Sequence, residues 1–285
     1  MDNENYKLKE LRIHNIKDSG ACAERKFRTV FDLSEINSLT AEISLYNKKF
    51  DEEYWSAILS FYCYRRTEKS RDELLFSKYL DIEGEETDNI IEASFSFDTD
   101  DFTEWTAGDY ILKTLIDGEE ADVSFFWLEA AGELSDGQNP YFEIYNIKLF
   151  EDTSIPEPKH IERAYYSQFQ RMSTRLIWTE FEIRNKYLAK KWRGEFFFNY
   201  YNDLRQLVKQ VVKVVDIGPN PPNHEFFVEA GWGHPENVSW EEGRYTVEIV
   251  FMGKVMAIAR FIVADSVDRG KCEYTVLWKE NHVRI

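Results

Sequence analysis

Cysteine and histidine are scarce in this chain, and their scarcity argues against several kinds of site. The 285 residues include three cysteines (Cys22, Cys63 and Cys272) and five histidines, and no Cys-x-x-Cys or His-Glu-x-x-His pair marks a zinc site. No two cysteines occupy equivalent places in the repeat described below, so a shared disulfide is not expected, as is usual in a reducing compartment. We therefore expect neither a metal ion nor another cofactor.

Catalytic and targeting motifs are missing as well. The sequence has no Gly-x-Ser-x-Gly turn, no reactive cysteine context and no Gly-x-x-x-x-Gly-Lys-Ser/Thr phosphate loop. Its first residues lack the basic start and apolar run of a signal peptide. No apolar stretch approaches the roughly 20 residues that cross a bilayer. The sequence thus predicts a non-catalytic, soluble, cytoplasmic protein that binds no membrane.

Positive charge is in short supply, but only in the first half. The chain has 35 basic and 52 acidic residues, a formal net charge of −17. Residues 1–140 hold 15 basic and 32 acidic residues, whereas residues 141–285 hold 20 of each. This balance disfavours a nucleic-acid partner. The acidic run 81–88, with Asp98, Asp100 and Asp101, could gather calcium ligands, but it lacks the spacing of a known calcium loop, so a solvated loop is favoured.

The second half of the chain repeats the first. The phrase Trp105-Thr106-Ala107-Gly108-Asp109-Tyr110 returns as Trp240-Glu241-Glu242-Gly243-Arg244-Tyr245. Four further blocks align at nearly constant spacing: Glu24 to Phe31 with Glu162 to Phe169, Glu42 to Asn47 with Glu180 to Asn185, Trp55 and Phe61 with Trp192 and Phe198, and Phe125 with Phe261. This order of blocks predicts an internal duplication. We expect domains at 1–134 and 135–265, a linker within 132–140, and a tail at 266–285.

Alternation of apolar and polar residues predicts strands in both halves. Hairpins are expected at 110–127 and 245–263, and Val123, Phe125 and Trp127 are expected on the buried face of the first. Two more strands are expected upstream of each hairpin. Residues 204–215 fit a helix or a strand, as do their counterparts at 74–80. The fold class is all-β: two tandem Ig-like antiparallel β-sandwiches with at most short helices.

The second repeat resembles a recurrent bacterial Ig-like β-sandwich module. The resemblance rests on Phe169-x-Arg171-x-x-x-Arg175-x-Ile177-Trp178, on Gly231-Trp232-Gly233-x-Pro235 and on Trp240-x-x-Gly243-x-Tyr245-x-Val247, followed by Phe261. Modules of this kind are often appended to AAA-type ATPases or helical-repeat proteins. The resemblance implies an accessory interaction domain and supplies no catalytic residues. The first repeat lacks the Gly-Trp-Gly phrase and the paired arginines.

Residues shared by the repeats are expected to be scaffold, and residues in which the repeats differ are candidates for binding. The scaffold set is Trp105, Gly108, Tyr110, Trp240, Gly243 and Tyr245, in which each tyrosine hydroxyl caps a turn as in strand F of Ig domains. The binding candidates are Trp232, which has no evident counterpart in the first repeat, the adjacent His234, the basic tip Lys190, Lys191 and Arg193, and the tail residues Tyr274 and Trp278.

These features favour a protein-interaction or adaptor module. The tail is expected to form an extra strand whose free edge could dock a protein partner or a second copy of the chain. The alternative is a carbohydrate-binding sandwich in which Trp232 and Trp240 stack on sugar rings. An enzyme that uses the acidic run is least favoured, because paired catalytic carboxylates need a fixed separation.

Overall fold

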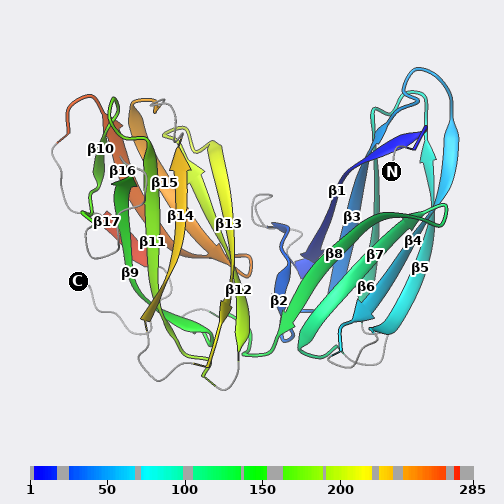
Figure 1. Ribbon diagram of the computed structural model, residues 1–285, viewed down its shortest axis with the longest axis horizontal. Coiled ribbons are helices and arrows are strands. Elements are labelled where there is room, and N and C mark those ends of the chain that lie inside the picture. Colours follow the sequence, from blue (N-terminus) through cyan, green and yellow to red (C-terminus); the bar gives the residue numbers. More distant parts are fainter. Residues whose placement is uncertain are drawn as a thin grey trace. The chain divides into compact units, whose positions relative to one another are not determined.

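The computed structural model describes residues 3–17, 26–67, 72–98, 105–135, 138–152, 163–188, 191–219, 225–233 and 240–267, and the backbone of 273–276 (Figure 1). The structure is all-β, as predicted. The described residues form strands joined by turns, and none of their helical turns is long and apolar enough to cross a bilayer. The chain divides into two compact units between Gly132 and Glu133.

The first unit packs a three-stranded sheet on a five-stranded one. The smaller sheet has the order β1 (Tyr6–Asn15), β3 (Ser38–Asn47), β6 (Ile90–Asp98). The larger sheet has the order β2 (Val30–Asp32), β8 (Glu119–Glu129), β7 (Gly108–Ile116), β4 (Trp55–Arg65), β5 (Glu73–Gly84). The apolar faces of both sheets meet in one buried cluster, which makes the unit a β-sandwich.

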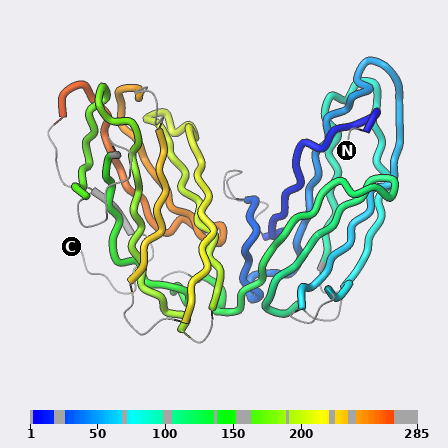
Figure 2. The backbone as a smooth tube through the Cα atoms, viewed as in Figure 1, coloured from blue at the N-terminus to red at the C-terminus, as the bar shows by residue number. Residues whose placement is uncertain are grey.

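The second unit repeats this plan. Its smaller sheet has the order β14 (Glu225–Gly233), β11 (Leu176–Asn185), β9 (Phe142–Asp152). Its larger sheet has the order β10 (Gln168–Gln170), β16 (Lys254–Ala264), β15 (Gly243–Phe251), β12 (Trp192–Tyr201), β13 (Leu207–Ile217). Figure 2 lets the same path be followed in each unit. The parallel pairs β2–β8 and β10–β16 are also equivalent, so the duplication extends to strand pairing.

The predicted extra strand is present as β17 (Glu273–Val276). It pairs antiparallel with β16, Tyr274 standing opposite Ala259. One edge of this strand is therefore used within the unit, which weakens the expectation that it docks a partner.

The segments that fitted both helix and strand are edge strands of the larger sheets. β5 pairs with β4 alone and β13 with β12 alone. Both faces of an edge strand are partly exposed to water, so apolar residues there do not alternate strictly with polar ones, and the sequence pattern can resemble that of a helix. The exposed apolar side chains are Leu74 and Tyr79 on β5, and Val208, Val212 and Val214 on β13.

The prediction that Val123, Phe125 and Trp127 face the core was wrong by one residue. Phe126 and Leu128 are fully buried, whereas Phe125 is 42% exposed. A register shift between Thr114 and Leu115 moves the return strand by one residue, and a shift of one residue exchanges the two faces of a strand. The counterpart of Phe261 is therefore Phe126, since each stacks on the tyrosine of its own hairpin, Tyr245 and Tyr110.

Each unit contains a tyrosine corner at the start of its hairpin. The hydroxyl of Tyr110 donates to the carbonyl of Thr106 at 2.6 Å, and that of Tyr245 to the carbonyl of Glu241 at 3.0 Å. Both bonds reach four residues back along the chain, as in Ig domains. Burial, the largest cause, raises the pKa of both phenols, which therefore remain donors at neutral pH.

A buried asparagine ties together the same three segments in each unit. In the second unit the side-chain carbonyl of Asn185 accepts the indole N–H of Trp192 at 3.1 Å and the backbone N–H of Tyr187 at 3.0 Å. Its amide donates to the carbonyl of Gly218 at 3.2 Å. Asn47 and Trp55 repeat the arrangement in the first unit, with an indole bond of 2.9 Å. The asparagine thus fixes where β11 ends and β12 begins.

The outer face of the smaller sheet in the second unit holds a buried charge cluster. Glu180 is fully buried, and one of its oxygens accepts from the guanidinium of Arg163 at 2.8 Å. Arg163 also contacts Glu229 and lies over the Phe150 ring, 4.3 Å from its centroid. The ammonium of Lys148 is 3.6 Å from Glu180. These charges tie the segment before β10 to the sheet.

Candidate functional site: the open end of the second sandwich

Trp232 has a counterpart in the first unit, contrary to the sequence-based expectation. Trp232 stands opposite Ile177 in the β11–β14 register, and Phe97 stands opposite Leu39 in the β3–β6 register. Phe97 contacts Trp105 as Trp232 contacts Trp240, with centroids 5.8 and 4.4 Å apart. The first unit has a phenylalanine in the place of this tryptophan and no second Gly-Trp-Gly phrase, so the sequence alone does not reveal the correspondence. Phe97 is fully buried, whereas Trp232 is half-buried, so among the described residues this end of the sandwich is more open in the second unit.

The glycines on either side of Trp232 have structural causes. A Cβ on Gly231 would lie 2.8 Å from two atoms of the Trp178 ring, which packs over the strand there. Gly233 has a φ of +141°, and a Cβ on it would meet the backbone carbonyl oxygen of Arg175. In the first unit the place of Trp178 and Gly231 is taken by Thr40 and Ser96, whose hydroxyls are 2.9 Å apart. The Gly-Trp-Gly phrase therefore reflects packing.

Gly233→Ala is expected to lower the stability of the second unit by about 2–3 kcal/mol, because backbone strain and a backbone clash add. Gly231→Ala is expected to cost about 1–2 kcal/mol, because the Trp178 ring can shift. Gly243→Ala is the matched control, since the nearest atom to its added Cβ is the Asp203 carboxylate at 3.4 Å. Urea unfolding followed by hydrogen exchange in β14 measures all three. Equal costs for Gly233→Ala and Gly243→Ala would contradict this account.

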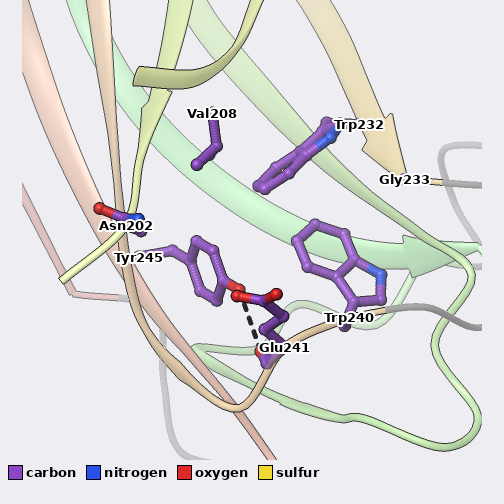
Figure 3. Close-up of a pocket in the computed structure, with 7 residues that line it drawn as sticks. All are labelled: Asn202, Val208, Trp232, Gly233, Trp240, Glu241 and Tyr245. Carbon is purple, nitrogen blue, oxygen red and sulfur yellow. Dashed lines mark hydrogen bonds between the residues drawn. The ribbon is translucent and has the colours of Figure 1, made fainter. Parts of the chain in front are cut away.

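A hollow of about 230 Å³ opens beside Trp232 (Figure 3). We call it the aromatic hollow. Trp232 and Trp240 lie edge to face, and the Tyr245 ring lies beside them, its centroid 5.7 Å from each indole. The indole N–H of Trp240 donates to the carbonyl of Arg175 at 3.3 Å, which fixes its ring. The remaining lining residues are Asn202, Val208, Gly233 and Glu241. The hollow thus has a rigid aromatic wall and a polar rim.

A second hollow of about 470 Å³ adjoins the first and shares Asn202 and Tyr245 with it. We call it the arginine hollow, because Arg205, Arg244 and Arg260 line it, and Asp203 is the one acidic residue among its described lining residues. Arg205 belongs to the turn between β12 and β13, and the other two lie on β15 and β16. This group was not predictable from the sequence, since its members come from three separate segments.

The two tryptophans do not form a flat platform. Their ring planes are inclined at 68°, and Trp240 is only 7% exposed. A sugar ring stacks on an exposed indole face, and an edge-to-face pair with one buried member offers little of that face. The stacking arrangement expected for carbohydrate binding is therefore absent from this end of the unit.

The predicted basic tip is partly neutralised within the unit. Lys191 and Arg193 both bind Asp216 on the neighbouring strand, with N–O distances of 2.9 and 2.7 Å. Lys190 lies outside the described residues. Because these two cations share one acid, their combined charge is reduced from +2 to +1.

The Asp216 carboxyl is expected to titrate far below an ordinary aspartate. Its hydrogen bond with Arg193, the largest cause, lowers its pKa to about 2. A depressed folded pKa adds stability above the unfolded value, near 4, and this contribution is lost as the pH falls from about 4 to 2. Carboxyl carbon NMR shifts measured against pH test the assignment. In the Arg193→Gln variant the midpoint of the Asp216 titration should rise by about one pH unit. An unchanged midpoint would contradict the role of Arg193 in lowering this pKa.

The other candidates contribute less to the site. His234 and Trp278 lie outside the described residues, and only the backbone of Tyr274 is described. Among the residues that the structure describes, no three histidine, cysteine or acidic side chains gather closely enough to hold a metal ion. Cys63 is a buried free thiol whose pKa is raised by burial, so it is unreactive at neutral pH.

Comparisons with known proteins do not assign the chain to a family. No protein-family model and no curated protein matches it. Among solved structures, it is similar to red sea bream transglutaminase, with a TM-score of 0.30 and 10% identity over 93% of this chain and 32% of that one. It is also similar to a beta-glucosidase from Kluyveromyces marxianus in complex with glucose, with a TM-score of 0.27 and 12% identity over 42% and 14% of the two chains. The chain spans less than a third of either structure, and likenesses this remote carry no argument about function.

Proposed function

We propose that this protein is a non-catalytic interaction module that binds a protein partner through the open end of its second sandwich. The observation that carries the proposal is the pair of adjoining hollows, one aromatic and one lined by arginines. Tryptophan, tyrosine and arginine are the residues enriched at the centres of protein interfaces. The aromatic hollow suits one apolar side chain of a partner, held against Trp232.

The comparison of the two units supports the same place. Both units have the same strand pairing and the same tyrosine corner, so those features serve the fold. The units differ at this end, where Phe97 is buried and Trp232 is half-exposed. The second unit keeps the strand pairing and the tyrosine corner of the first but has a more open end at Trp232. This difference is consistent with a binding role at that end. An association with an AAA-type ATPase and a place in the cytoplasm are further parts of the proposal, and they rest on sequence alone.

Site-specific photo-crosslinking in the full chain tests the proposal. Benzoylphenylalanine in place of Val208, which lines the aromatic hollow and is 40% exposed, should give a discrete crosslinked protein in native lysate. The matched control is Val214, which lies on the same strand, is 48% exposed and lines neither hollow. The same products from both positions, or none from Val208, would remove the proposed site.

A further inference from the structure

The arginine hollow carries two guanidinium groups without a partner among the residues that the structure describes. Arg244 and Arg260 are exposed, and neither forms an ion pair or a side-chain hydrogen bond with a described residue. Arg205 differs, because it binds Glu248 at 2.7 Å and lies over the Tyr201 ring. Arg244 and Arg260 are therefore the exposed guanidinium groups of this hollow that a ligand can reach.

Strand register places Arg244 and Arg260 on one face as diagonal neighbours. Arg260 stands opposite Thr246, and Arg244 stands opposite Ile262, two residues further along each strand. Diagonal neighbours on a sheet are within reach of long side chains, and like charges there repel. An arrangement that costs some stability without a counter-ion points to a ligand that supplies one.

The fold itself does not need these arginines. In the β7–β8 register of the first unit, the pair equivalent to Arg244 and Ile262 is Asp109 and Trp127. The residue equivalent to Arg260 is Phe125, which stands opposite Ile111. The same hairpin therefore forms with an acid and an aromatic in these places, so the cations belong to the second unit's surface chemistry.

The acids near the hollow do not balance its cations. Arg205 is already paired with Glu248, so Arg244 and Arg260 together with Asp203 leave a net charge of +1 among the described lining side chains. The Asp203 carboxylate accepts from the backbone N–H of Arg244 at 3.1 Å, which holds it at the rim. Glu273 stands opposite Arg260 in the β16–β17 register, where only its backbone is described. The site therefore favours an anion of limited charge.

We propose that the arginine hollow binds side-chain carboxylates of an acidic segment on the protein partner. Guanidinium groups bind carboxylates through paired, charge-assisted hydrogen bonds. A short acidic segment is the fitting ligand, because the hollow holds too few cations to neutralise a long polyanion. This inference rests on the proposed function and names the partner's chemistry: one apolar side chain for the aromatic hollow, with acidic neighbours for the arginine hollow.

The test uses dye-labelled peptides and the full chain at about 0.1 M salt. The probe is acetyl-Glu-Glu-Leu-Glu-Glu-amide, and its counterparts carry glutamine or phosphoserine in place of glutamate. Fluorescence anisotropy should show binding of the glutamate peptide about tenfold tighter than that of the glutamine peptide, because charge-assisted bonds are lost. Equal affinities for these two, or binding of the phosphoserine peptide alone, would overturn the carboxylate assignment.

Paired variants locate the binding. Arg244→Gln with Arg260→Gln should weaken the glutamate peptide about tenfold, and Asp203→Asn should strengthen it two- to threefold by removing a competing carboxylate. Lys209→Gln with Lys213→Gln removes the same charge from β13, outside the hollow, and should change affinity less than twofold. An equal loss from both double variants would overturn the site. Suppose that Arg244→Gln with Arg260→Gln leaves the peptide affinity unaltered and that crosslinking at Val208 continues. This result would reject the carboxylate inference and leave the proposed function standing.

Discussion

Arg163→Met is expected to lower the unfolding free energy of the second unit by about 3–5 kcal/mol. The substitution removes the guanidinium that binds Glu180, whose carboxylate is fully buried, and a buried charge that loses its charged partner is costly. Lys148, 3.6 Å from that carboxylate, and the Tyr165 hydroxyl, which donates to it at 3.1 Å, replace only part of the lost interaction. Urea unfolding combined with hydrogen exchange in β11 measures the change and assigns it to this unit.

Two further variants separate charge burial from simple loss of contacts. Arg171→Met breaks an exposed pair, in which the guanidinium is 3.3 Å from Asp265, and should cost no more than about 1 kcal/mol. Arg163→Met with Glu180→Leu should recover much of the lost stability, because no charge then remains buried without a partner. If Arg163→Met and Arg171→Met cost the same, water reaches Glu180 and the cluster is not a buried one.

Asn185→Ala is expected to cost about 3–4 kcal/mol. Three hydrogen bonds disappear, and the indole N–H of the buried Trp192 loses its acceptor. A buried donor without a partner costs about 1–3 kcal/mol in addition to the bonds themselves. Chemical unfolding monitored by exchange in β11 and β12 gives the value, and Asn47→Ala should behave alike in the first unit.

A double-mutant cycle isolates the indole bond. In a Trp192→Phe background, Asn185→Ala should cost about 1–2 kcal/mol less, because no indole N–H is left unpaired. Asn202→Ala is the control, since this residue accepts two backbone N–H groups in an exposed turn. A cost for Asn185→Ala that is independent of Trp192 would show that the bond does not hold the strands together.

The duplication and the sandwich were predictable from the sequence because they depend on local patterns. The alternation of apolar and polar residues shows which residues of a strand face the core, and the Trp-x-x-Gly-x-Tyr phrase marks the start of one strand. Both patterns occur in both units. The pattern could not resolve edge strands such as β13, where both faces meet water and the period of two is blurred. It also missed the one-residue shift at Thr114 and Leu115, which no residue type announces.

The site was predictable only in part. Trp232 was a candidate because the repeats differ there, and Trp240 belonged to the shared scaffold phrase, and both line the aromatic hollow. The arginine hollow needed the register, because Arg205, Arg244 and Arg260 are brought together by strand pairing. Likewise, Arg163 and Glu180 belonged to aligned blocks of the repeat, yet nothing in their spacing showed that they form a buried pair.

The exchange of Thr40 and Ser96 for Trp178 and Gly231 bears on how the chain avoids misfolding. Tandem units of like topology can trade strands while they fold, and the traded forms aggregate. A β11 strand paired with β6 would press the Trp178 ring on Ser96, since even a Cβ at the natural partner position lies 2.8 Å from that ring. A β3 strand paired with β14 would lose the Thr40–Ser96 bond and leave a gap above Gly231. Strands paired across the units would therefore pack less well than the native pairs, which favours pairing within each unit.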